Sequence, residues 1–110
     1  MNRNVFQRMP TVGVEDGSFQ NGITQKALLA AVLLRGVVIE DARTREITID
    51  GLDATETLTE MLENWEFAAL LLAGVSFAGF NVIDPTMIQE RFEKPVIVVS
   101  RTKPDNRAVK

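Results

Sequence analysis

The sequence contains neither cysteine nor histidine. Without cysteine the chain can form no disulfide, no thiolate nucleophile and no zinc site built on sulfur ligands. Without histidine it lacks the commonest general base near neutral pH, the Ser-His-Asp arrangement and imidazole ligands for metals. The side chains left for chemistry are carboxylates, lysines and hydroxyls, so any bound metal would be an oxygen-liganded ion such as magnesium.

Long hydrophobic runs are also missing. The longest, Ala27 to Leu34 and Phe67 to Ala73, fall far short of the roughly 20 residues that cross a bilayer. The N-terminus sets Arg3 and Arg8 around a few apolar residues and lacks the apolar centre of a secretory signal. These two features predict a cytoplasmic protein with no membrane partner.

The composition is that of an ordinary globular chain, with 110 residues of which 45% are hydrophobic and 25% charged. This length suits one domain, so we expect residues 1–110 to form a single unit. The net charge of −3 argues against a surface coated with positive charge for indiscriminate nucleic-acid binding. Basic residues gather from Lys94 onward, either as a solvated terminal segment, which we favour, or as a phosphate-contacting patch that includes Arg101 and Lys103.

Two apolar segments in the first third of the chain predict strands. The first, Thr11 to Val14, runs into an acidic turn at residues 15–17. An Asn-Gly pair within residues 18–25 predicts a chain reversal. The second apolar segment, Ala27 to Leu34, then reads as a central strand.

Three more strands are predicted further along. Residues 37–50 end in alternating apolar and polar positions, the period of a half-exposed strand near an edge, whereas the charged residues 40–45 suit solvent or a bend. Phe67 to Ala73 has the composition of a parallel strand covered on both faces. Pro95 to Val99 is a further β-branched strand.

Two segments predict helices. Asp53, followed three residues later by Glu56, has the pattern of a capping box. The apolar residues that follow recur on one helical face: Ala54, Leu58, Met61, Leu62 and Trp65. Asp84 followed by Pro85 predicts the N-cap and first position of a second helix, which ends near Glu93.

The predicted order is three strands in an antiparallel meander, then helix, strand, helix and strand. Right-handed crossovers place the fourth strand beside the first and the fifth outside it. The expected fold is therefore an α/β mixed sheet in the order 3-2-1-4-5, with helices on both faces. In such sheets ligands bind beyond the carboxyl ends of the parallel strands.

The acids Glu15 and Asp16 lie at the predicted end of the first strand. Adjacent strand residues point to opposite faces, so only one of them would aim at a given site. Their carboxylates could hold magnesium and position a water for phosphodiester attack. The alternative, which we favour from the residues alone, is a turn hydrogen bond from Asp16. Glu56 likewise has a structural interpretation as a capping residue, whereas nothing local requires an amide at Asn81.

Five segments are distinctive as a set: residues 12–19 (VGVEDGSF), 50–55 (DGLDAT), 74–84 (GVSFAGFNVID), 95–99 (PVIVV) and 103–105 (KPD). From about Pro10 to the last residue, this set resembles an uncharacterised, mainly archaeal protein family related to endonuclease V. The resemblance implies a ribonuclease-H-like fold, whose sheet has the order predicted above from the pattern of elements.

The resemblance also implies a site. The metal-binding acid at the end of the first strand of endonuclease V falls on Glu15, with Asp16 beside it, and a later glutamate falls on Glu56. The acid of the fourth strand falls on Ala73, so one expected ligand is missing. A C-terminal helix with a further acid would lie beyond Lys110, which implies a chain that is short at its C-terminus. Losing one ligand from a two-metal site weighs against hydrolysis.

Three functions remain open. The first is a magnesium-dependent endonuclease acting on DNA or RNA, in which the three acids just named are both metal ligands and catalytic residues. The second is a non-catalytic nucleic-acid-binding module that uses Phe80 and Asn81 together with Arg101 and Lys103. The third is a protein-interaction domain, including a homo-oligomer, in which exposed Phe77 and Phe80 make the contact, although we favour both as buried anchors of their loop.

Overall fold

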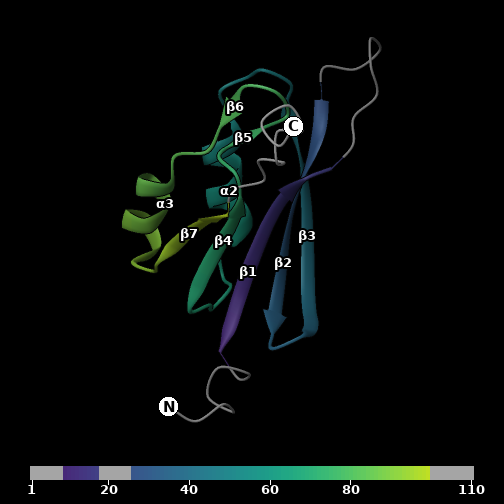
Figure 1. The fold of residues 1–110 in the computed structure, drawn as a ribbon. Helices are drawn as coiled ribbons and strands as arrows, with labels where there is room; N and C mark the ends of the chain where they lie inside the picture. The colour runs from purple at the N-terminus through teal and green to yellow at the C-terminus, as the bar shows by residue number, and fades with distance from the viewer. Residues whose placement is uncertain (1–8, 18–25, 100–110) are drawn as a thin grey trace, which may run out of the picture.

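The computed structural model describes residues 9–17 and 26–99 (Figure 1). The strands are β1 (Pro10–Asp16), β2 (Lys26–Arg35), β3 (Val38–Thr48), β4 (Ala69–Ala73), β5 (Ser76–Phe77), β6 (Asn81–Val82) and β7 (Val96–Val99). The helices are α2 (Ala54–Leu62) and α3 (Pro85–Phe92). Neither of these described helices is long and apolar enough to span a membrane.

Five strands pair in the order β3-β2-β1-β4-β7, which confirms the predicted arrangement, and β5 and β6 form a separate hairpin. The central strand β1 pairs antiparallel with β2 and parallel with β4. β3 pairs antiparallel with β2, and β7 pairs parallel with β4. The connection from β4 to β7 contains α3, because two parallel strands need a long crossover between them.

β3 lies within the predicted segment 37–50 and runs without a break through its charged part. Residues 40–45, which we expected in solvent or at a bend, lie in the middle of this strand and pair with β2. Most of their side chains are exposed, and charges of this kind protect the unpaired edge of a sheet. The Asn-Gly reversal, the segment 103–105 and the basic residues Arg101 and Lys103 all lie outside the described residues.

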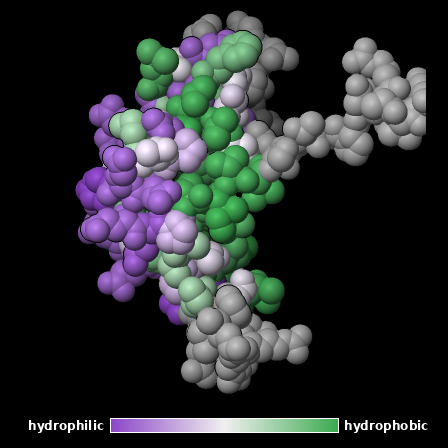
Figure 2. All heavy atoms as spheres, turned by 60° about the vertical axis from the view of Figure 1, so that its left-hand side comes forward, coloured by the Kyte–Doolittle hydropathy of each residue, from purple (hydrophilic) through white to green (hydrophobic). Residues whose placement is uncertain are grey.

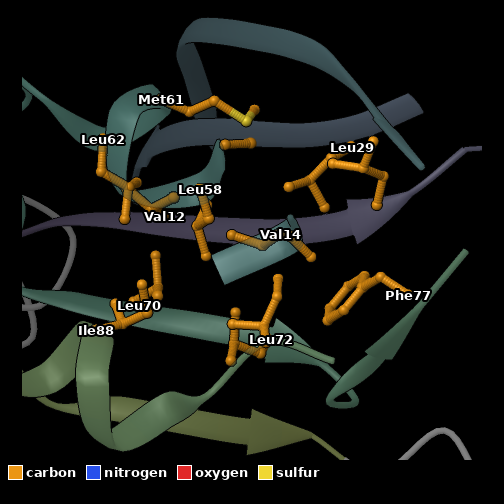
Figure 3. Close-up of a cluster of buried hydrophobic side chains, with 14 of the residues drawn as sticks. Val12, Val14, Leu29, Leu58, Met61, Leu62, Leu70, Leu72, Phe77 and Ile88 are labelled. Atoms are coloured by element: carbon orange, nitrogen blue, oxygen red, sulfur yellow. The ribbon is translucent and has the colours of Figure 1, made fainter. Parts of the chain in front are cut away.

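The hydrophobic core lies between one face of the sheet and the two helices (Figure 3). Alternate residues of β1 and β4 are buried on this face, namely Val12, Val14, Leu70 and Leu72. The predicted helical stripe meets them and is confirmed by four buried residues of α2: Ala54, Leu58, Met61 and Leu62. Ile88 of α3 joins the same cluster, and Trp65 packs against it beyond the end of α2.

Both described helices cover the same face of the sheet. Leu71 projects from β4 in the opposite direction to its neighbours and is 37% exposed, although Leu70 and Leu72 are fully buried. The predicted cover on both faces of β4 is therefore not provided within residues 9–17 and 26–99. The helices expected on the second face are not found in that part of the chain either.

Candidate functional site

The predicted site lies at the edge of the sheet where β1 and β4 end, at the top of Figure 1. These strands are parallel neighbours, so their carboxyl ends meet at the same edge. The chain leaves β4 at Gly74, which has a φ of +88° that glycine adopts readily. The β5–β6 hairpin, residues 76–82, follows at once and lies beyond this edge.

Asp16 ties the hairpin to the central strand. Its Oδ2 accepts a hydrogen bond from the backbone N–H of Ala78 at 3.1 Å. The partner lies 62 positions along the chain, so Asp16 acts between segments and not only within its own turn. The hairpin is thereby held over the end of β1.

A second carboxylate, Asp50, holds the other side of the hairpin turn. Its Oδ1 accepts the backbone N–H of Phe80 at 2.9 Å, and its own N–H donates to the carbonyl of Ala78 at 2.9 Å. Gly79 lies between Ala78 and Phe80 and has a φ of +80°. A Cβ at this position would overlap Oδ1 of Asp50, so both the backbone and the packing require glycine.

Asn81 is fully buried and joins the hairpin to the rest of the fold. Its Oδ1 accepts the backbone N–H of Ala54 at 2.9 Å, and its Nδ2 donates to the carbonyl of Thr48 at 2.7 Å and to Oδ1 of Asp53 at 2.6 Å. Nothing local requires this amide, as expected, because its three partners lie 27 to 33 positions away in the sequence. Asn81 thus positions the hairpin, and its buried side chain is not presented to a nucleic acid.

Asp53 completes this network and departs from the predicted capping box. Its carboxylate accepts the backbone N–H and the hydroxyl of Thr48 at 3.1 and 3.0 Å, and it makes no capping hydrogen bond to α2. Asn81 takes over the N–H of Ala54 at the start of the helix. Burial acts to raise the pKa of Asp53, but hydrogen bonds from Asn81 and Thr48 outweigh it and hold this pKa below its ordinary value.

The second helix begins as predicted. Asp84 is its N-cap and accepts the backbone N–H groups of Thr86 and Met87 at 3.0 and 3.4 Å. The N–H of Asp84 donates to the hydroxyl of Thr55, which donates to the carbonyl of Val82. The starts of α2 and α3 are therefore both connected to the hairpin.

The two aromatic residues of the hairpin have opposite environments. Phe77 is fully buried and points into the core, so it is the anchor that we favoured (Figure 3). Phe80 is 80% exposed, so the same expectation fails for this residue. Because Asp16 and Asp50 fix the turn on either side, Phe80 projects from a supported loop.

The three acids of the predicted metal site do not gather into one cluster. Glu15 and Asp16 point to opposite faces, as expected, since Glu15 lines the groove on the sheet face away from the helices while Asp16 bonds to the hairpin. Glu56 is exposed in the first turn of α2. Within residues 9–17 and 26–99, no three acidic side chains are placed to hold a metal ion. These residues alone do not fit a complete carboxylate site, and β4 ends at Ala73 without contributing an acid.

Sequence reasoning missed three residues that shape this edge: Thr48, Asp50 and Gly79. The pair Asp50-Gly51 carried a usable signal, because Asp tolerates the left-handed region and Asp50 has a φ of +57°. No local pattern indicated that Thr48 would bond to both Asp53 and Asn81.

A mixed sheet in this order, with a hairpin beyond the carboxyl ends of its central parallel strands, has the fold of endonuclease V. Endonuclease V of Ciona intestinalis, solved in complex with DNA containing an inosine, superposes with a TM-score of 0.60 over 91% of this chain and 48% of its own, at 13% identity. A protein of unknown function from Archaeoglobus fulgidus superposes more closely, with a TM-score of 0.77 at 30% identity over 92% of this chain and 58% of its own.

The chain belongs to the Endonuclease dU family, whose sequence model matches residues 7–110. A UPF0215 protein of Thermococcus gammatolerans is 38% identical over 118 residues, which cover 99% of this chain and 60% of that protein. The resemblance to an archaeal family related to endonuclease V is confirmed. The chain spans about half to three fifths of the length of such archaeal relatives.

Proposed function

We propose that this chain is the nucleic-acid-binding part of an endonuclease V-like protein, and that Phe80 of the β5–β6 hairpin contacts the substrate. The observation that carries the proposal is the exposure of this ring on a turn held by Asp16 and Asp50. Aromatic rings bind unpaired bases by stacking, which tolerates different base identities. A turn that is fixed before binding loses little conformational entropy when a base stacks on it.

The substrate class that we propose is DNA or RNA with a deaminated base. Two findings support it: the family description names deoxyuridine, and the Ciona structure holds DNA with an inosine. Unstacking a base that pairs poorly costs less free energy than unstacking a Watson–Crick-paired base, so the exposed ring of Phe80 would reach it more readily.

The acidic character of this edge predicts how binding depends on cations. Glu15, Asp16, Asp50 and Glu56 lie on the segments around the hairpin, and phosphate groups would be repelled by them. We therefore expect affinity to rise when Mg²⁺ is present. Arg101 and Lys103 are proposed to supply phosphate contacts, and their removal would weaken binding to all sequences alike.

The test is fluorescence anisotropy with a labelled single-stranded DNA that contains one deoxyuridine. Phe80→Ala should weaken binding about 5- to 150-fold, which corresponds to about 1–3 kcal/mol for one stacked base. Phe80→Trp should retain the affinity. Val37→Ala is the matched control, since Val37 is 97% exposed in the β2–β3 turn at the opposite end of the sheet. Equal affinities of the Phe80→Ala and Val37→Ala variants would refute the proposal.

A second candidate function is magnesium-dependent hydrolysis with Glu15, Asp16 and Glu56 as ligands and catalytic residues. Because these three acids do not gather within residues 9–17 and 26–99, this function would need further ligands from outside that part of the chain. Family membership and the place of Glu15 and Asp16 at the end of the central strand support it. Cleavage of the same oligonucleotide in Mg²⁺ but not in a chelator, lost in Glu15→Gln, is the expected result. Binding without cleavage would leave the recognition proposal standing and exclude this second function for the chain.

A further inference from the structure

A pocket of about 470 Å³ lies at the end of the sheet opposite the hairpin, where β1 and β4 begin (Figure 1). We call it the end pocket. A hydrogen bond of 2.7 Å from the N–H of Ala68 to the carbonyl of Pro10 joins two of the segments that form it. Its volume is in the range of small-molecule sites. Three aromatic residues, two charged residues and a proline line it, namely Trp65, Phe67, Phe92, Glu66, Lys94 and Pro10.

The aromatic walls of the end pocket are held in place by contacts of their own. The centroids of the Phe67 and Phe92 rings lie 5.7 Å apart, and the rings are tilted by 55°. The Arg43 guanidinium lies 4.2 Å from the centroid of the Trp65 ring, and the indole N–H of Trp65 donates to Asp41. Rings that are fixed before binding lose little conformational entropy when a ligand packs against them.

Two side chains of opposite charge line the end pocket. Within residues 9–17 and 26–99, the side chains of Glu66 and Lys94 form no ion pair or hydrogen bond with each other or with a third residue. The neighbouring cations are already bound, because Arg91 pairs with Glu63 and Arg43 donates to two backbone carbonyls at the end of α2. Among the described residues, the pocket therefore offers one unpaired carboxylate, one unpaired ammonium group and no net charge.

The end pocket combines apolar and charged groups around one cavity. Elsewhere they separate: on the face shown in Figure 2, hydrophilic side chains gather on one side and apolar side chains form a band beside them. A ligand that matches the pocket has a flat apolar body, a cationic group for Glu66 and an anionic group for Lys94. A nucleotide matches less well, because its phosphate carries only negative charge and Glu66 would repel it.

We propose that the end pocket binds a free α-amino acid with an aromatic side chain. The α-ammonium group of the ligand pairs with Glu66, its α-carboxylate pairs with Lys94, and its ring packs against Phe67 and Phe92. Both charged side chains are exposed, so each ion pair adds modestly to the affinity. The proposal is independent of nucleic-acid binding, which we place at the other end of the sheet.

The test is a titration of the purified chain with L-phenylalanine, followed by calorimetry and by the fluorescence of Trp65, which lines the pocket and is the only tryptophan. We expect saturable one-to-one binding. Phenethylamine lacks the carboxylate and 3-phenylpropionate lacks the ammonium group, so each should bind about fivefold more weakly, the effect of one ion pair near a surface. N-acetyl-phenylalanine amide, which represents phenylalanine within a polypeptide, lacks both charges and should bind more weakly still.

Two variants assign the charged groups of the ligand to their partners. Glu66→Gln should weaken the binding of L-phenylalanine about fivefold but should not weaken that of 3-phenylpropionate, which has no group for Glu66. Lys94→Met should weaken the binding of L-phenylalanine similarly but should not weaken that of phenethylamine. A general loss of folding would weaken all ligands alike. Glu46→Gln is the matched control, because it removes the same charge from an exposed side chain of β3 outside the pocket, and it should leave every affinity unchanged.

Four results would overturn the proposal. The first two are a lack of saturable binding of L-phenylalanine and equal affinities for L-phenylalanine and its two singly charged analogues. Equal binding of the N-acetyl amide would overturn it in favour of a polypeptide partner. Tighter binding of uridine 5′-monophosphate than of L-phenylalanine would overturn it in favour of a nucleotide site.

Discussion

Asn81 is the residue whose replacement tests most directly how the hairpin is held. Asn81→Ala removes three hydrogen bonds from a fully buried position. The N–H of Ala54 is left unpaired, at about 1–3 kcal/mol for a buried group, and Asp53 loses a charge-assisted bond worth about 1.5–3 kcal/mol. The carbonyl of Thr48 loses one of two partners and keeps the N–H of Gly51. Relaxation and water entry offset part of this sum, so we expect a loss of about 3–4 kcal/mol in the free energy of unfolding.

The assay is equilibrium unfolding in urea followed by the fluorescence of Trp65, the only tryptophan in the chain. Its ring lies 4.2 Å from the Arg43 guanidinium and its indole N–H donates to Asp41, so unfolding changes its surroundings. The control is Gln89→Ala, which removes an exposed amide from α3 and should change the free energy by less than about 0.5 kcal/mol. A cost below about 1 kcal/mol for Asn81→Ala would refute the structural role argued for this amide.

Asn81→Asp separates hydrogen bonding from shape. The new carboxylate fills the same space but sets an oxygen against the carbonyl of Thr48 and the carboxylate of Asp53, which raises its pKa in the folded state. Because the pKa of this carboxyl is raised in the folded state, its protonation stabilises the fold. The free energy of unfolding of the Asn81→Asp variant should therefore be low near about pH 7 and rise as the pH falls towards about 5. Equal stability of the Asp and Ala variants at every pH would contradict this account.

Two further predictions concern the same edge. The pKa of Asp53 is lowered by its hydrogen bonds, so its contribution to stability is present above its unfolded pKa and is lost as the pH falls through the lower folded value. The Asp53→Asn variant should therefore be less stable than the unaltered chain at neutral pH and should lose less stability as the pH falls. Parallel curves of unfolding free energy against pH for the two proteins would contradict this. Gly79→Ala should cost about 1–2 kcal/mol or more, from its positive φ and the overlap with Asp50. When Asp50 is also replaced by alanine, Gly79→Ala should cost less stability. If the losses of the two single variants simply add in thermal unfolding, the Cβ at position 79 does not overlap the side chain of Asp50.

Local patterns were sufficient to predict most of the framework. The apolar run from Ala27 to Leu34 forms an interior strand with Ala27, Leu29 and Ala31 buried, and the stripe of α2 is buried as its spacing predicts. Asp84 and Pro85 mark the start of α3 because capping acts within one helical turn. The sheet order followed from the handedness of crossovers, which limits how parallel strands can be connected.

Long-range hydrogen bonds account for what local patterns missed. Asp53 carries the signature of a capping box, yet its carboxylate bonds to Thr48 and Asn81, and Asn81 is brought to it from a segment 28 positions away. The exposure of Phe80 beside the burial of Phe77 likewise depends on how the hairpin turn sits on Asp16 and Asp50.

The sequence by itself determined the strands, their order in the sheet and the place of Glu15 and Asp16 at the end of the central strand. The strands and the acids follow from the spacing of neighbouring residues, and the order follows from the handedness of crossovers. Only the tertiary structure decided what that edge is made of. It joined residues up to 62 positions apart, made Asp16 a support for the hairpin, and left Phe80 exposed beyond it. Such contacts arise from the packing of distant segments, and no local pattern encodes them.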